Sequence, residues 1–123
     1  MPKLRIVLIG YGRMGHEIRR VAEERGHRVV LTIDQDNQED FVAEKIAGAD
    51  VAIEFTLPEA GFDNIMTCLQ AGLPVVSGTT GWLDRFDEVS AYCKQQGGAF
   101  FYASNFSIGV NLFFRFNQYM AQV

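Results

Sequence analysis

Short apolar runs alternate along the chain with longer stretches in which apolar residues recur at helical spacing. The apolar runs predict β-strands at residues 4–9, 29–33, 51–55, 74–77 and 99–102. The periodic stretches predict helices at residues 14–25, 39–47, 58–71 and 82–96. In the last of these helices, Phe86, Val89 and Cys93 are expected to face the core. Because strands and helices alternate, the pattern indicates a parallel sheet covered on both faces.

A glycine-rich turn joins the first predicted strand to the first predicted helix. Residues 10–15 read Gly-Tyr-Gly-Arg-Met-Gly, and a strand that leads through this spacing into a helix is the dinucleotide-binding fingerprint. Gly10 permits the tight turn, Gly12 lets a pyrophosphate approach the backbone, and Gly15 lets the helix pack close to its strand. The expected fold class is therefore α/β, a Rossmann-like doubly wound parallel sheet.

An acidic residue follows the second predicted strand. Asp34 lies 24 residues after Gly10, close to the roughly 20 residues that separate the glycines from the ribose-binding acid in such folds. A carboxylate there accepts hydrogen bonds from the adenosine ribose hydroxyls and would repel a 2′-phosphate. The alternative interpretation is that Asp34 is an ordinary turn or helix-capping residue.

Small and polar residues follow four of the predicted strands, in loops at residues 10–15, 55–58, 78–81 and 104–107. In open parallel sheets, ligands bind beyond the carboxyl ends of the strands, so these loops predict one binding crevice. Phe55 and Thr56 are candidate cofactor-binding residues in the second loop. The glycines and hydroxyls of residues 78–81 suit close contact with an amide or a carboxylate. Taken singly, each loop also fits an ordinary turn.

Composition narrows the classes of partner. The chain has 123 residues, 48% hydrophobic and 21% charged, with a formal net charge of −4. The absence of a basic stripe predicts no nucleic-acid partner, and no apolar run approaches the roughly 18 residues of a membrane span. Cys68 and Cys93 are expected to be buried small hydrophobes, which favours the cytosol.

The two histidines carry no predicted chemistry. His16 is expected at the start of the first helix near the phosphates, and His27 in a surface turn. No metal-ligating cluster is predicted, and no arrangement of Ser, His and Asp or of Cys and His points to a hydrolase.

The last segment predicts a domain boundary. Residues 1–108 are expected to form the dinucleotide-binding domain, and residues 109–123 a helix with apolar side chains on most of its sides. Such a helix is usually buried on several faces. We therefore expect a single domain that lacks a carboxy-terminal substrate and tetramerisation domain, into which this helix would lead.

Four motifs together resemble the amino-terminal domain of the 4-hydroxy-tetrahydrodipicolinate reductases, also called dihydrodipicolinate reductases. They lie, in the family's order, at residues 10–15, 54–58, 77–81 and 104–111. The resemblance implies NAD(P)H-dependent reduction of 4-hydroxy-tetrahydrodipicolinate, a small dicarboxylate, to tetrahydrodipicolinate. That reaction belongs to the diaminopimelate and lysine pathway, and the full-length enzyme would be a homo-oligomer.

The resemblance also implies a role for each matching position. The residues that would hold the pyrophosphate are Gly10, Gly12, Arg13, Met14 and Gly15, and Asp34 would hold the adenosine ribose. Those that would line the nicotinamide pocket are Gly78, Thr79, Thr80, Ser104, Asn105 and Phe106. Family members often place an arginine after the ribose-binding acid, where this chain has Gln35. NADH is therefore the expected cofactor, with NADPH possible because Arg13 can partly compensate.

The family's His-His-x-x-Lys substrate segment does not occur in this sequence. The resemblance therefore implies no catalytic residue in this chain, and cofactor binding without turnover. One alternative is the cofactor domain of a sugar or homoserine type of two-domain dehydrogenase, which shares the stretch at residues 71–75 but not the loop at residues 78–81. Another is a stand-alone nucleotide-binding or redox-sensing module, which the apolar last helix disfavours unless it forms a dimer interface.

Overall fold

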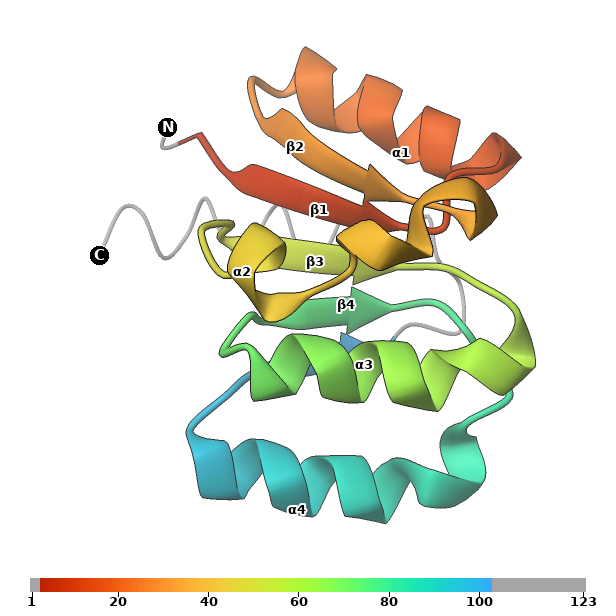
Figure 1. Cartoon of the computed structure of the whole chain (residues 1–123), viewed down its shortest axis with the longest axis vertical. Helices are drawn as coiled ribbons and strands as arrows, with labels where there is room; N and C mark the ends of the chain where they lie inside the picture. The colour runs from red at the N-terminus through yellow and green to blue at the C-terminus, as the bar shows by residue number, and fades with distance from the viewer. Residues whose placement is uncertain (1–2, 103–123) are drawn as a thin grey trace.

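The computed structural model describes residues 3–102 of the chain, and these form one five-stranded sheet (Figure 1). All neighbouring strands are parallel, in the order β2-β1-β3-β4-β5. The strands are β1 (Arg5–Ile9), β2 (Arg28–Ile33), β3 (Val51–Glu54), β4 (Val75–Ser77) and β5 (Phe100–Tyr102). The five predicted strands are all present, with bounds within one residue of those expected.

Helices cover both faces of this sheet. The α-helices are α1 (Arg13–Glu24), α2 (Ala43–Ile46), α3 (Gly61–Gln70) and α4 (Phe86–Gln96). Three short 3₁₀ helices precede α2, α3 and α4, namely η1 (Gln35–Asp40), η2 (Pro58–Ala60) and η3 (Leu83–Arg85). The hydrophobic core forms two clusters, one that includes Ile18 and Ala22 of α1 and one that includes residues of α2, α3 and α4. The α/β, doubly wound prediction is therefore confirmed.

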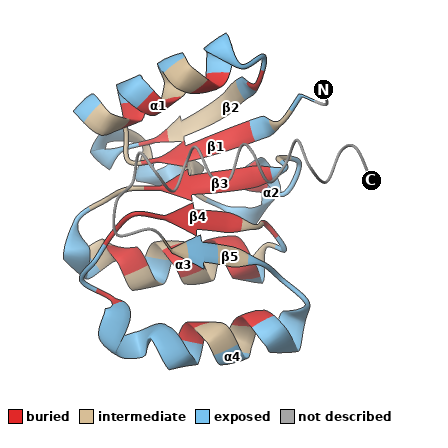
Figure 2. Ribbon diagram, turned by 180° about the vertical axis from the view of Figure 1, so that it is seen from behind, coloured by how far each residue is buried: buried red, intermediate tan, exposed pale blue. Residues whose placement is uncertain are grey.

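The sequence of β1 shows how one strand serves both clusters. Ile6 and Leu8 pack in the α1 cluster, whereas Val7 and Ile9 pack in the other. Successive side chains of a strand point to opposite faces, so a strand buried on both sides is a continuous apolar run rather than an alternating one. Figure 2 shows the burial of the central strands.

The strand order creates a reversal point between β1 and β3. The chain leaves β1 through α1 to reach β2 on one side, and later reaches β3 on the other side of β1. At such a point the two connections diverge, and a crevice forms beyond the carboxyl ends of the strands.

The prediction of a single helix at residues 39–47 is wrong. The segment instead forms η1 and then the short α2, separated by an extended Val42. Asn37 departs from helical geometry: its Nδ2 donates to the Thr32 carbonyl at 2.8 Å, and its Oδ1 accepts from the Asp34 N–H at 2.7 Å. Such side-chain bonds to the backbone compete with α-helix formation.

The helix expected at residues 82–96 starts later than predicted. Trp82 is 1% exposed and lies before η3, and α4 begins at Phe86. Val89 and Cys93 are buried as expected, but Phe86 is 38% exposed. The ring of Phe86 stacks on Trp82 with a centroid distance of 5.7 Å, so Trp82 takes the inward place that the helical pattern assigned to Phe86.

His27 does not lie in a surface turn, as predicted, but is buried. The Leu4 N–H donates to His27 Nδ1 at 3.1 Å, which joins the segment before β1 to the turn before β2. Burial, together with the nearby Arg25, lowers the pKa of His27. The neutral ring therefore serves as a backbone acceptor inside the fold.

Two groups of predicted residues lie outside the described part of the chain. They are the candidate pocket residues Ser104, Asn105 and Phe106, and the helix expected at residues 109–123. Within the described residues, none of the helices has the length and apolar character needed to cross a bilayer.

Candidate functional site

A cleft lies beyond the carboxyl ends of β1, β2 and β3, at the reversal point of the sheet. Its volume is about 970 Å³, near the upper end of the roughly 300–1,000 Å³ of small-molecule sites. Residues 10–15, the segment after β2 and the segment after β3 line it. The sequence thus brings three separate loops to one place.

The three glycines of the β1–α1 turn meet different surroundings. Gly10 has a φ of +98°, and a Cβ added there would lie 2.0 Å from the Phe55 carbonyl oxygen. A Cβ on Gly15 would lie 2.6 Å from the Gly10 carbonyl oxygen. A Cβ on Gly12, in contrast, would meet nothing within 4 Å. Protein packing therefore requires Gly10 and Gly15, whereas Gly12 faces open space in the cleft.

The N-terminus of α1 points its backbone donors toward this space. The helix begins at Arg13 with Gly12 as its N-cap, no side chain caps it, and its first turn holds no acidic residue. The first N–H groups of a helix have no acceptor within the helix, and the helix dipole adds partial positive charge there. His16, in the first turn as predicted, donates from Nδ1 to the Gly12 carbonyl at 2.8 Å and stacks on Tyr11. The turn is thus held while its donors stay available for an anion.

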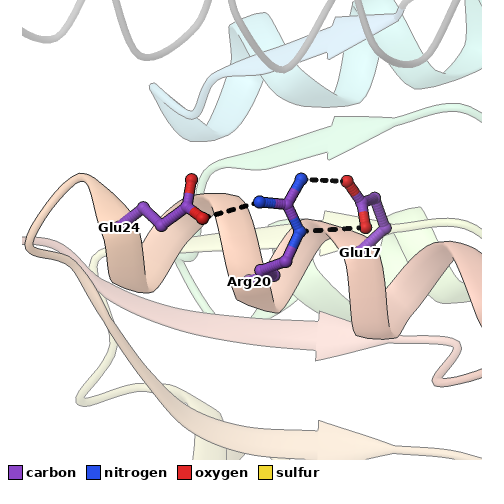
Figure 3. A network of polar contacts seen from close by, with 3 residues as sticks. All are labelled: Glu17, Arg20 and Glu24. Atoms are coloured by element: carbon purple, nitrogen blue, oxygen red, sulfur yellow. Dashed lines mark hydrogen bonds and ion pairs between the residues drawn. The ribbon is translucent and has the colours of Figure 1, made fainter.

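Of the residues that the structure describes, three with charged side chains line the cleft, namely Arg13, Glu17 and Asp34. Arg13 is exposed and forms no ion pair with any residue of the described 3–102 range. Glu17 is paired with Arg20, which also donates from Nη1 to Glu24 at 2.6 Å (Figure 3). The hydrogen bonds from Arg20 lower the pKa of Glu17, and the pairing offsets its negative charge.

Asp34 lies at the end of β2 with its side chain exposed on the cleft. Its backbone is held on both sides, since its N–H donates to Asn37 Oδ1 at 2.7 Å and its carbonyl accepts from Gln38 Nε2 at 3.0 Å. Asp34 is also the N-cap residue of η1. Both sequence interpretations of Asp34, the ribose acid and the helix cap, therefore have a structural counterpart.

The segment after β3 forms the opposite wall. Phe55 and Thr56 line the cleft as predicted. Leu57, which belongs to the predicted loop at residues 55–58, also lines it. Ala60 and Asn64 line it as well, and sequence reasoning missed these two. Asn64 lies four residues after Ala60, which places both on the same side of the helix. A polar residue at that spacing was the signal in the sequence that α3 also faces the cleft. Asn64 Nδ2 donates to Thr56 Oγ1 at 3.0 Å, which fixes the Thr56 side chain.

The loop after β4 does not line the cleft. Gly78 and Thr79 are buried and Thr80 is exposed, and none of the three is among the lining residues. A Cβ on Gly81 would lie 2.3 Å from the Cβ of Pro58, so that glycine makes room for the neighbouring loop. The role of residues 78–80 toward a cofactor stays a prediction.

A buried carboxylate lies behind this wall and was not singled out from the sequence. Glu54, the last residue of β3, has no exposed surface. The Thr79 hydroxyl lies 2.6 Å and 2.7 Å from its two oxygens. Burial raises the pKa of Glu54 to about 7, although hydrogen bonds from Thr79, Thr56 and Ser77 act in the opposite direction. A glutamate at the end of an otherwise apolar strand was the signal in the sequence.

The two cysteines suggest no further chemistry. Cys68 and Cys93 are buried and unpaired, as expected, and burial raises the pKa of the Cys68 thiol. Between residues 3 and 102, no three His, Cys, Asp or Glu side chains lie close enough to hold a metal ion.

Residues 4–106 match a family model described as the N-terminus of dihydrodipicolinate reductase. The chain is 47% identical over 118 residues to the 4-hydroxy-tetrahydrodipicolinate reductase of Christiangramia forsetii. The match covers 96% of this chain and 48% of that protein. It is 37% identical over 125 residues to the reductase of the same name from Streptomyces coelicolor, with 98% and 49% covered. The chain thus spans about half the length of these curated relatives.

Solved structures share the fold. An NAD-binding protein from Listeria innocua superposes with a TM-score of 0.67 at 18% identity, over 85% of this chain and 36% of that chain. A hyperthermophilic archaeal homoserine dehydrogenase mutant in complex with NADPH superposes with a TM-score of 0.61 at 14% identity, over 81% of this chain and 44% of that chain. At such identities the likeness shows the fold alone.

Proposed function

Because the chain belongs to the dihydrodipicolinate reductase family, we propose that the cleft at the reversal point binds NADH in an extended pose along its two walls. The observation that carries this proposal is the placement of three features around one cleft. They are the uncapped N-terminus of α1, the open space at Gly12 and the exposed carboxylate of Asp34. These residues fit a dinucleotide, because its pyrophosphate needs donors and its ribose needs an acceptor, and both line the same cleft.

Each wall has a distinct task in this proposal. The N–H groups at residues 12–15 and the Arg13 side chain bind the pyrophosphate, and Asp34 accepts from the adenosine ribose hydroxyls. Phe55 and Thr56 line the path toward the nicotinamide end. The further residues of that pocket are Gly78, Thr79, Thr80, Ser104, Asn105 and Phe106. When bound, the reduced nicotinamide supplies the hydride, while the residues of the chain bind and orient it.

The proposed preference for NADH follows from charge. A 2′-phosphate on the adenosine ribose would meet the Asp34 carboxylate, and Gln35 beside it supplies no positive charge. Between residues 3 and 102, Arg13 is the cation that lines the cleft, and it belongs to the pyrophosphate turn. NADPH is therefore expected to bind, but more weakly.

The proposed reaction is that of the named relatives. The full-length protein would reduce 4-hydroxy-tetrahydrodipicolinate in the diaminopimelate and lysine pathway, as a homo-oligomer. We expect the 123-residue chain to bind cofactor without turnover. In support, the charged groups that line the described cleft are Arg13, Glu17 and Asp34. Arg13 and Asp34 bind the nucleotide in this proposal, and Glu17 is paired with Arg20.

Calorimetric titration of the 123-residue chain with NADH and with NADPH tests the proposal. Saturable binding of NADH, tighter than that of NADPH, is the expected result. No binding of either dinucleotide would overturn the assignment of the cleft, and tighter binding of NADPH would overturn the assignment of Asp34. Oxidation of NADH on addition of the dicarboxylate substrate would show that the chain is a competent catalyst, against our expectation.

A further inference from the structure

The buried Glu54 carboxylate is joined to the cleft wall by a directed chain of hydrogen bonds. The Thr56 N–H donates to Thr79 Oγ1 at 2.9 Å. Because that oxygen accepts there, the proton of the Thr79 hydroxyl is free to point at Glu54, whose two oxygens lie 2.6 Å and 2.7 Å away. One hydroxyl thus connects a buried carboxylate to the backbone of a residue that lines the cleft.

A second hydroxyl strengthens this connection from the other side. Thr56 Oγ1 accepts from Asn64 Nδ2 at 3.0 Å and lies 3.4 Å from Glu54 Oε1. Both Thr56 and Asn64 line the cleft. Among residues 3–102, no cation forms an ion pair with Glu54. The carboxylate is therefore satisfied by hydroxyl groups, two of which belong to the loops after β3 and β4.

The same two loops are packed without space between them. A Cβ on Gly61 would lie 2.8 Å from Thr79 Cγ2 and 2.9 Å from Trp82 Cδ1. In the loop after β4, a Cβ on Gly81 would lie 2.3 Å from Pro58 Cβ. The loop after β4 therefore contacts the segment after β3 at Thr79, Gly81 and Trp82, and supports it there.

The segment after β3 in turn fixes the pyrophosphate turn. The Phe55 N–H donates to the Ile9 carbonyl at 2.8 Å, and the Phe55 carbonyl leaves no room for a Cβ on Gly10. A displacement of residues 55 and 56 would therefore change both walls of the cleft.

We propose that Glu54 is a positioning residue for the cofactor: through the Thr79 hydroxyl it holds the backbone of Thr56, and with it the wall formed by residues 55–57, in the geometry that binds the dinucleotide. This inference rests on the proposed function, since it concerns the same cleft. It assigns a role in binding to a carboxylate that has no exposed surface and does not line the site. It also gives Thr79 a task different from direct contact with the cofactor.

Four substitutions test the proposal by NADH titration of the 123-residue chain. Thr79→Val keeps the branched shape and removes the hydroxyl, and Glu54→Met keeps the length and removes the strong acceptor. We expect each to weaken NADH binding about tenfold, the effect of a lost buried hydrogen bond. Thr79→Ser and Glu54→Gln keep a hydroxyl and an acceptor oxygen, and should bind within about threefold of the wild type.

A matched control separates positioning from general stability. Val89→Ala creates a cavity under α4, away from the cleft, and should lower the melting temperature while NADH affinity stays unchanged. Hydrogen exchange of the Thr56 amide gives a second readout, because this N–H loses its acceptor in Thr79→Val and should exchange faster there.

Two results would overturn the positioning role. One is wild-type affinity in both Thr79→Val and Glu54→Met; the other is a loss of affinity that follows melting temperature across all variants, Val89→Ala included. If Glu54→Met does not fold, Thr79→Val and Thr79→Ser decide the question. A wild-type chain that binds no NADH would overturn the proposed function and this inference together. In both results named above, by contrast, the wild type binds NADH and only the positioning role fails.

Discussion

Gly12 and Gly81, one in each of two glycine-rich loops of this chain, serve opposite purposes. Both loops follow a central parallel strand, one at residues 10–15 and the other at residues 78–81. In the first loop, a Cβ on Gly12 would meet open space, and the loop lines the cleft. In the second, a Cβ on Gly81 would strike Pro58, and Thr79 is buried against Glu54. A glycine motif at a strand end therefore does not by itself show that a ligand approaches; the neighbour of the missing Cβ decides.

The largest effect that can break this comparison is expected at Gly81. In Gly81→Ala, the new methyl group would lie 2.3 Å from Pro58 Cβ and 2.8 Å from Pro58 Cα, so one of the two loops must move. Overpacking of this kind should lower the free energy of unfolding by about 3 kcal/mol. Denaturant titration measures it. A stability equal to that of the wild type would mean that the loop after β4 has freedom that the packing does not show.

The second prediction concerns pH and the carboxylate beneath the packed loop. Burial raises the pKa of Glu54 from 4.5 to about 7, so the folded chain binds its proton more tightly than the unfolded chain does. Protonation of Glu54 therefore stabilises the folded chain. This contribution to the free energy of unfolding is fully present below about pH 4.5 and is lost as the pH rises toward 7. At about 1.4 kcal/mol for each pKa unit, the loss amounts to at most about 3 kcal/mol.

Unfolding of the wild type and of Glu54→Gln at several pH values measures this loss. The amide does not titrate, so the wild type should lose stability relative to the variant between about pH 4.5 and 7. Of the other titratable groups, Cys68 is coupled electrostatically to Glu54, and burial moves its pKa upward and away from this window. A constant difference between the two proteins would show that Glu54 titrates as if it were exposed.

The third prediction concerns the open loop. In Gly12→Ala, the methyl group meets no protein atom within 4 Å, and the φ of −90° is negative. We expect stability to change by less than about 0.5 kcal/mol, while NADH affinity falls about tenfold because the methyl group occupies the approach of the pyrophosphate. Paired with Gly81→Ala, this variant gives the opposite outcome in the measurement of stability. Unchanged affinity would place the pyrophosphate elsewhere.

The hydrophobic pattern predicted the strands well because a strand buried on both faces is apolar throughout, as in Ile6 to Ile9. It failed where polar side chains decide the backbone, as Asn37 does in η1. The lining residues Gly10, Gly12 and Asp34 follow from local spacing, so the sequence was sufficient for them. The Glu54–Thr79 contact joins residues 25 positions apart, and its existence depends on strand order, which local patterns do not contain.

The smallest expected effect concerns the end of the cleft beyond the open loop, where Gln35 follows Asp34. Gln35 lines the cleft and is exposed, so Gln35→Arg would place a guanidinium beside the adenosine ribose. Exposed charge pairs contribute about 1 kcal/mol or less, so NADPH affinity should rise about fivefold at most, with NADH affinity nearly unchanged. Asp34→Ala should narrow the preference for NADH over NADPH in another way, by weakening the binding of NADH. Competition titrations at two salt concentrations test this, because a gain carried by an exposed charge shrinks as salt is added. If Gln35→Arg raised the affinity of NADH and NADPH equally, the added charge would be acting on the pyrophosphate, and the adenosine end of the cleft would not lie at Asp34.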